Sequence, residues 1–153
     1  MSLEEKTKNL DAEIRKLEIQ SLISAVGGII LGGIASKMEL PDLPGKINNL
    51  IYGTPLALIG VSQIIKNTAL IKNEILNNFA KSNSKGTSMY SVGLGALLAF
   101  QAARLLDYGS LNDNPELLRQ SIVTTCYGAS FFLTGLSAML SDYKEINYSP
   151  RQK

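Results

Sequence analysis

Histidine and tryptophan are absent from this chain of 153 residues, and cysteine occurs once, as Cys126. A lone thiol can form neither an intrachain disulfide nor a cysteine metal cluster, and the acidic residues are scattered, so no metal site or other cofactor is expected. The net charge of +2 comes with no basic tract. We therefore expect no nucleic-acid partner.

Charge is also missing from four long stretches of the sequence. These charge-free stretches, of 18 to 22 residues each, are 19–36, 47–65, 86–103 and 120–141. A soluble helix needs only one apolar face, so charges normally recur on its other face. Stretches of this length match the roughly 20 residues that cross a hydrocarbon core of about 30 Å. The pattern favours an integral membrane protein, with a soluble helical bundle as the alternative.

The predicted fold is all-α, a membrane four-helix bundle made of two tandem transmembrane hairpins. Its four-span domain covers residues 19–153, with spans at about 19–37, 47–66, 87–104 and 120–141. The polar segment that precedes the first span is too long and too acidic for a secretory signal, so we expect that span to be retained. In the second span, Pro55 predicts a kink. The run Asn114–Pro115–Glu116 predicts a capped helix start before the fourth span.

Two polar segments have amphipathic helical patterns. Residues 1–18 should form a helix that continues into the first span, either as a solvated extension lying against the bundle or as a short coiled-coil handle. In residues 67–80, Ile71, Ile75 and Phe79 share one face. This segment either extends the second span or lies on the membrane surface.

Lysine and arginine are divided unevenly between the two predicted sides of the membrane. Eleven lie in the N-terminal segment, the connection between the second and third spans, and the C-terminal segment, and four lie in the two opposite connections. The positive-inside rule therefore places both termini on the cytoplasmic or matrix side. The expected location is a bacterial inner membrane or an organelle inner membrane.

Small residues recur every four positions in the first and third spans. Such ladders let helix backbones approach closely in lipid, where no hydrophobic drive joins the helices. The predicted helix-packing interface consists of Ser24, Gly28, Gly32, Ser36, Ser91, Gly95, Ala99 and Ala103.

The second and fourth spans share the pattern Tyr-Gly-x6-Gly-x-Ser. Its residues are Tyr52, Gly53, Gly60 and Ser62 in the second span, and Tyr127, Gly128, Gly135 and Ser137 in the fourth. One interpretation is a duplicated hairpin whose copies are related by an axis along the membrane normal. The other is that small residues are simply common in membrane spans.

The chain shows little that could carry out catalysis. No ionisable residue lies in the interior of a predicted span, and no glycine-rich phosphate loop is present. The uncharged polar residues inside the spans are Gln63, Gln101, Thr124, Thr125 and Thr134. They could line a pore or form hydrogen bonds between helices. The sequence predicts that the protein is not an enzyme.

The most economical function is that of a structural or assembly subunit of a larger membrane complex, acting through small-residue helix packing. Its partners would be the lipid bilayer and other membrane-protein subunits or copies of itself. The alternatives are an oligomeric pore, as a passive transport or secretion-channel component, and a membrane immunity or regulatory protein. In architecture alone, the glycine-rich four-span pattern resembles the inner-membrane protein translocase family. The long loop that follows the first span in that family is missing here, so no residue role is carried over.

Overall fold

The computed structural model describes residues 3–38, 49–68, 74–84 and 87–148, and the regular structure in these ranges is entirely helical. This confirms the predicted all-α class. In chain order, the elements are α1 (Leu3–Lys37), the π-helix η1 (Asn49–Gly53), α3 (Thr54–Lys66), α4 (Glu74–Ser84), α5 (Thr87–Leu111) and α6 (Pro115–Tyr148).

Three of the described helices are long and apolar enough to cross a membrane. They are Thr7–Lys37 within α1, the whole of α5 and the whole of α6. At 1.5 Å per residue the 25 residues of α5 extend about 38 Å, whereas the 13 residues of α3 extend only about 20 Å. The predicted second span corresponds to η1 and α3, although its positions 47 and 48 lie outside the described residues. A fourth crossing would therefore need η1 and α3 together.

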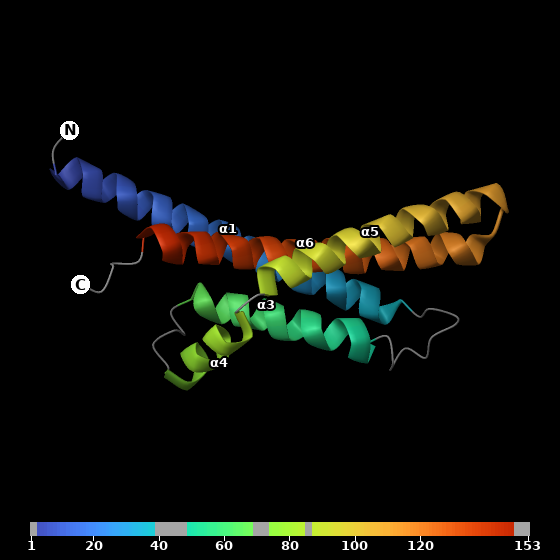
Figure 1. Ribbon diagram of the computed structural model, residues 1–153, viewed down its shortest axis with the longest axis horizontal. Coiled ribbons are helices and arrows are strands. Elements are labelled where there is room, and N and C mark those ends of the chain that lie inside the picture. Colours follow the sequence, from blue (N-terminus) through green and yellow to red (C-terminus); the bar gives the residue numbers. More distant parts are fainter. Residues whose placement is uncertain (1–2, 39–48, 69–73, 85–86, 149–153) are drawn as a thin grey trace.

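The central helix is α6 (Figure 1), which contacts α1, α3 and α5. On α6, Gly128 and Gly135 face α5, whereas Ser130 and Thr134 face α1. Residues two apart lie on nearly opposite sides of a helix, so α1 and α5 flank α6. Helix α3 packs against α1 and α6, and α4 packs against α3, while α5 has little contact with α1 or α3. Most of the surface of α5 therefore makes no contact with the other described helices.

The α5–α6 connection forms as the sequence predicts. The Oδ1 atom of Asn114 accepts hydrogen bonds from the backbone N–H groups of Glu116 (3.0 Å) and Leu117 (3.4 Å). With Pro115 in the first position of α6, this is a capped helix start, and the prediction is confirmed. Asp113, with φ of 50°, makes the left-handed turn that reverses the chain.

Pro55 lies in a continuous helical run, because the π-helix η1 leads directly into α3, and the predicted kink stays a prediction. It is the second residue of α3, and because proline has no N–H, the usual hydrogen bond to the preceding turn, which lies in η1, cannot form. The irregular backbone lies one turn earlier, in η1, whose wider π turns connect to α3 at Thr54.

The segment after α3 is not a straight continuation of the second predicted span. Helix α3 ends at Lys66, and the N–H of Asn67 closes its last turn by donating to the carbonyl oxygen of Gln63 at 3.2 Å. Helix α4 lies beside α3 (Figure 1), with Ile75 and Phe79 exposed. Ile71, which was predicted to share their face, lies outside the described residues.

The buried faces of the long helices repeat every three and a half residues. These positions are Ser21, Ala25, Gly28, Gly32 and Ala35 on α1, and Ser91, Gly95, Leu98 and Ala102 on α5. Alternating steps of four and three keep one face against a neighbouring helix. Nearly all of these side chains are small, so the helix axes lie close together.

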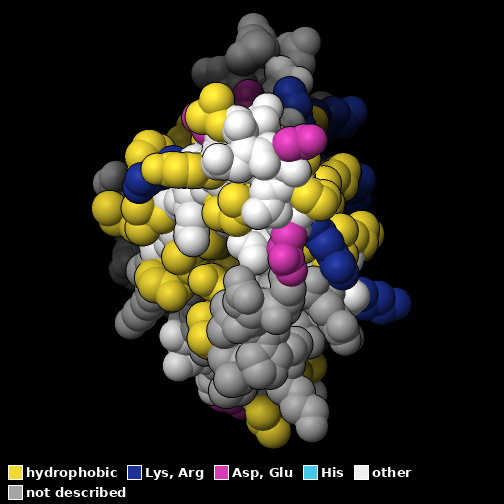
Figure 2. Space-filling view, turned by 90° about the vertical axis from the view of Figure 1, so that its right-hand side faces the viewer, with side chains coloured by type: hydrophobic (Ala, Val, Ile, Leu, Met, Phe, Trp, Pro, Cys, Tyr) yellow, Lys and Arg dark blue, Asp and Glu magenta, His cyan; other side chains and the backbone are white. Residues whose placement is uncertain are grey.

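Large apolar side chains gather in one central cluster, and many of those outside it are exposed. The cluster consists of Ala35, Leu56, Ile59, Leu98, Val123, Tyr127 and Phe131. Outside it, Ile23, Leu97 and Phe100 are each about two-thirds exposed. Seen from the end where α5 and α6 are connected, hydrophobic side chains surround much of the periphery (Figure 2). A soluble bundle would bury such side chains, so this distribution favours lipid as the surrounding solvent.

The N-terminal extension belongs to the same helix as the first predicted span, since α1 runs unbroken from Leu3 to Lys37. It lies against the end of α6. The hydroxyl of Tyr148 donates a hydrogen bond to the Glu13 carboxylate at 3.0 Å, and Lys144 Nζ lies 3.1 Å from Glu18 Oε1. These contacts match an extension packed against the bundle.

Candidate functional site

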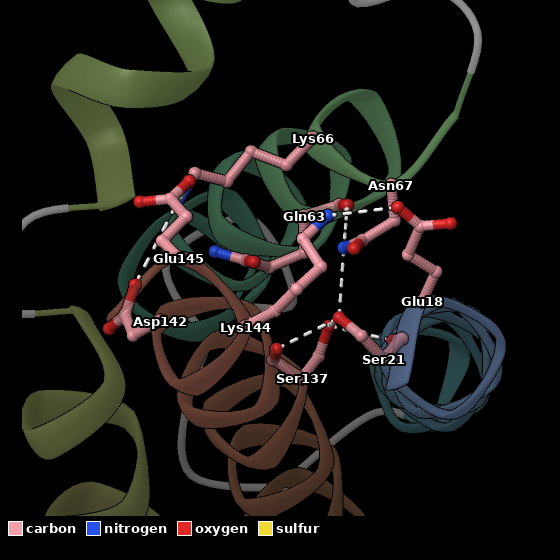
Figure 3. A network of polar contacts seen from close by, with 9 residues as sticks. All are labelled: Glu18, Ser21, Gln63, Lys66, Asn67, Ser137, Asp142, Lys144 and Glu145. Carbon is pink, nitrogen blue, oxygen red and sulfur yellow. Dashed lines mark hydrogen bonds and ion pairs between the residues drawn. The ribbon is translucent and has the colours of Figure 1, made fainter. Parts of the chain in front are cut away.

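The densest group of polar contacts lies where α1, α3 and α6 meet near the end of α3 (Figure 3). We call Ser21, Gln63, Lys66, Asn67, Ser137, Asp142 and Glu145 the polar cluster. In the predicted bundle it lies at the boundary of the spans, on the side assigned to the cytoplasm or matrix.

Reciprocal serine hydrogen bonds join α1 and α6 in the polar cluster. Ser21 Oγ lies 2.9 Å from both the carbonyl oxygen and the Oγ of Ser137, and Ser137 Oγ donates to the carbonyl oxygen of Ser21 at 2.7 Å. Asn67 brings in α3, because its Nδ2 donates to Ser21 Oγ at 2.8 Å. Both serines are fully buried. These bonds therefore fix the relative height of the three helices.

An ion pair joins α3 to α6 on the other side of the polar cluster. Lys66 Nζ lies 3.2 Å from Glu145 Oε1 and 3.7 Å from Asp142 Oδ1. Lys66 is 6% exposed, whereas the side chains of Asp142 and Glu145 are 39% and 54% exposed, respectively. The lysine is thus covered by protein while its partners remain in contact with solution. Sequence reasoning missed this pairing because Lys66 closes a charge-free stretch and resembles an ordinary boundary residue.

Gln63 is fully buried one turn before Lys66, and among the described residues neither its Nε2 nor its Oε1 has a hydrogen-bond partner. Its amide points to the same side of α3 as Lys66, Asp142 and Glu145 (Figure 3). The other buried side-chain atoms without a partner in the described residues are Asn67 Oδ1 and Ser91 Oγ. Unpaired buried polar atoms are costly, at about 1–3 kcal/mol each.

The small-residue ladder of α1 is divided between interior and surface. Gly28 and Gly32 are buried, and Ser24 and Ser36 are partly exposed. A Cβ atom on Gly28 would lie 2.9 Å from the carbonyl oxygen of Ser130. The hydroxyl of the same serine donates a hydrogen bond to the carbonyl oxygen of Gly28. A step of four residues rotates by about 40° on an α-helix, so a four-step ladder drifts off any one face.

The ladder of α5 shows the same drift. Ser91 and Gly95 are buried against α6, and Ala99 and Ala103 are exposed. The ladders therefore contribute to packing within the chain near Gly28, Gly32, Ser91 and Gly95, and their remaining members are at or near the surface.

Buried serines on α6 connect it to both flanking helices. Ser121 Oγ donates to the carbonyl oxygen of Ala102 on α5 at 2.8 Å, while Ser130 and Ser137 bond to α1. Apart from Ser137, a member of the repeated motif, the sequence reasoning did not identify these residues. The three-and-four spacing of small residues is the signal that could have revealed them.

The repeated Tyr-Gly-x6-Gly-x-Ser motif brings its two tyrosines into contact. The rings of Tyr52 and Tyr127 have centroids 5.3 Å apart and planes tilted by 35°. The two serines differ, since Ser62 Oγ bonds within α3 and Ser137 bonds to α1. The local backbone also differs, because Tyr52 lies in η1 and Tyr127 in the middle of α6.

The later glycines of the two motifs have comparable surroundings. A Cβ atom on Gly60 would lie 2.6 Å from Ile29 of α1, and one on Gly135 would lie 2.7 Å from Val92 of α5. Each glycine thus packs against the first helix of its own predicted hairpin. Internal duplication stays a prediction.

The polar residues suggested as a pore lining do not share a surface within one chain. Gln63 is buried between α3 and α6, and Gln101 is exposed on α5. The hydroxyls of Thr125 and Thr134 bond to carbonyl oxygens of their own helix, Ser121 at 2.8 Å and Ser130 at 3.1 Å. Thr124 is partly exposed.

An apolar groove of about 520 Å³ lies between α1 and α3, lined by Ile29, Gly32, Gly33, Ser36, Gly53, Thr54, Leu56, Ala57, Leu58 and Val61. Among the described residues, no three histidine, cysteine or acidic side chains are grouped so as to hold a metal ion. Cys126 is a partly buried free thiol that packs against the central cluster.

Comparison with family models, with curated proteins and with solved structures finds no match for this chain. Its function therefore has to be argued from its own residues.

Proposed function

We propose that this chain is a non-catalytic integral membrane protein that serves as a structural or assembly subunit of a larger membrane complex. The observation that carries the proposal is the distribution of side-chain size. Glycine, alanine and serine line the contacts between helices, and bulky apolar residues point outward along α1, α5 and α6. In lipid, helices associate through close packing of small residues rather than through a hydrophobic drive.

In this proposal η1 and α3 together supply the second crossing and complete a four-helix bundle of two hairpins. The start of α1 and the end of α6 lie at the same end of the molecule (Figure 1), as an even number of crossings requires. The unequal distribution of lysine and arginine assigns that end to the cytoplasmic or matrix side of a bacterial or organelle inner membrane.

The surface offered to other subunits consists of small residues that the chain does not use itself. A Cβ atom on Gly33 of α1 or on Gly93 of α5 would have no atom of the described residues within 4 Å. Ala99 and Ala103 of α5 are also exposed, on a side of the helix next to the contact with α6. Gly28 and Gly95, in contrast, are in contact with α6. The partner-binding surfaces we propose are therefore the outer face of α5 and the face of α1 around Gly33.

The test is extraction of the full chain from its native membrane in mild detergent, followed by size analysis and identification of co-purifying chains. We expect a discrete particle with fixed partners. Gly33→Leu or Gly93→Leu should release partners while leaving the chain folded, because the new Cβ atom would have no described atom within 4 Å. Gly95→Leu is the matched control that should disrupt the fold itself.

Retention of every partner in both surface variants would reject these two faces. A particle containing only copies of this chain would favour the alternative function, an oligomeric pore. Leakage of small solutes from vesicles containing the purified chain would then be the deciding measurement.

A further inference from the structure

The polar cluster contains a buried amide and an ion triad that lie on the same side of α3 (Figure 3). Gln63 is 0% exposed, and in the part of the chain that the structure describes both of its amide atoms lack a hydrogen-bond partner. Its amide points to the side of α3 where Lys66, Asp142 and Glu145 lie (Figure 3). Because an amide needs both an acceptor and a donor, the molecule that satisfies Gln63 must offer both.

We propose that the space between α3 and α6 is a water-binding site, with the Gln63 amide as its floor and the Lys66 side chain as its lid. Water both donates and accepts hydrogen bonds, so it can bridge the amide to the ion triad. The Lys66 ammonium has three N–H groups, of which the two carboxylates use two at most in direct contacts. A water molecule can accept from the third.

The position of Lys66 explains how water enters. Neither amide atom of Gln63 reaches solvent in the described conformation, so access requires a side chain to move. Lys66 has a flexible four-carbon stem, and its two partners on α6 are 39% and 54% exposed. A rotation of this side chain opens the site toward the solution that already hydrates Asp142 and Glu145.

A metal cation fits the site less well than water. The Lys66 ammonium already occupies the space between the two carboxylates, and a second positive charge there would be repelled by it. Water, being neutral, adds no such repulsion and leaves the ion triad intact.

Cysteine accessibility tests the site directly in the detergent-solubilised full chain. In a Cys126→Ser background, Gln63→Cys would be compared with Ile59→Cys, which lies one turn deeper on the same face of α3 and is 5% exposed. A small charged methanethiosulfonate reagent should modify the thiol of the Gln63→Cys variant at least about tenfold faster than that of the Ile59→Cys variant, a difference of about 1.4 kcal/mol in access. Equal rates would overturn the proposal.

Replacement of Gln63 by methionine provides a second, independent test. If the buried amide were dry, methionine would remove two unpaired groups and raise the melting temperature. If the amide binds water, the bridging water loses its partners and the melting temperature falls. A melting temperature equal to or above that of the parent protein would therefore reject the site. Gln101→Met, on the exposed face of α5, is the control for a change of side-chain type alone. Both tests are independent of the proposed function, because neither requires a partner subunit.

Discussion

Gly95 of α5 and Gly128 of α6 face each other at a close contact between these two helices. A Cβ atom on Gly95 would lie 2.9 Å from the carbonyl oxygen of Gly128, and one on Gly128 would lie 3.2 Å from the carbonyl oxygen of Gly95. The obstacle in both directions is backbone, which cannot rotate away as a side chain can. The close approach of α5 and α6 therefore requires glycine at both positions.

Gly95→Ala should lower stability by about 1–3 kcal/mol, because its methyl group would force the two backbones apart. Gly93→Ala is the matched control, since it lies two residues away in the same helix and its Cβ would meet open space. That variant should gain up to about 1 kcal/mol from helix propensity. Thermal unfolding in detergent measures both, and equal effects of the two substitutions would contradict the close contact.

The reciprocal bonds between Ser21 and Ser137 should appear as an energetic coupling. Each hydroxyl is both bonded to the other serine and fully buried, so removing either one leaves the other with fewer partners. A double-mutant cycle with both serines changed to alanine should give a coupling of about 0.6 kcal/mol, and at most about 1.7. Ser36→Ala is a suitable control, because Ser36 Oγ bonds only to Gly33 within its own turn in the described structure. Strictly additive effects of S21A and S137A would argue against the bond pair.

Lys66→Met should destabilise the chain by about 1–3 kcal/mol. Breaking a fully buried ion pair costs more and breaking an exposed one costs less, and this pair is intermediate because its carboxylates are half-exposed. The loss should shrink at high salt, since salt screens the pair in the parent protein. Lys37→Met, at the exposed end of α1, is the control. Unfolding curves at low and high salt would decide the matter, and a salt-independent loss would point to packing of the lysine stem instead.

The contact between Tyr148 and Glu13 predicts a pH dependence at alkaline pH. The hydrogen bond to the Glu13 carboxylate raises the pKa of Tyr148 above its ordinary value of 10.0, with smaller contributions from desolvation and from nearby charge. A group whose pKa is raised by folding stabilises the fold below its unfolded pKa, and that contribution is lost as the pH rises through the folded value. The contact should therefore hold α1 to α6 below a pH of about 10 and weaken above it.

Phenolate titration of the parent protein minus that of Tyr148→Phe isolates this residue. The difference curve should have its midpoint above the ordinary tyrosine value, and Glu13→Gln should move the midpoint back toward that value because the negative charge is gone. A midpoint at or below the ordinary value in the parent protein would show that the pair does not form in solution.

The helix ends and the helical class could be read from local chemistry. Asn114 caps α6 as predicted, because a cap depends only on the next few residues of the chain. The sequence shows where Pro55 lies, but it could not predict the backbone conformation around Pro55. The π-helix η1 that leads directly into α3 just before Pro55 could not be predicted, because the form of a helical turn depends on its packing as well as on the proline.

The long charge-free stretches predict apolar helices from sequence alone, because the absence of charge excludes a solvated face over those lengths. The sequence also limited the chemistry, since a chain without histidine and with one cysteine has few catalytic or metal-binding groups. Which small residues are buried between helices, in contrast, depends on how the helices pack against one another. The ladder that contains Gly28 and Ser36 advances by four residues a step and rotates away from the contact face. The buried contacts repeat every three and a half residues instead, and they include Ser21 on α1 and Ser130 on α6. Burial of Lys66 was likewise decided by α6, whose acidic side chains lie more than seventy residues away in the sequence. A charge pattern along one segment of sequence cannot show which residues another helix will place beside it.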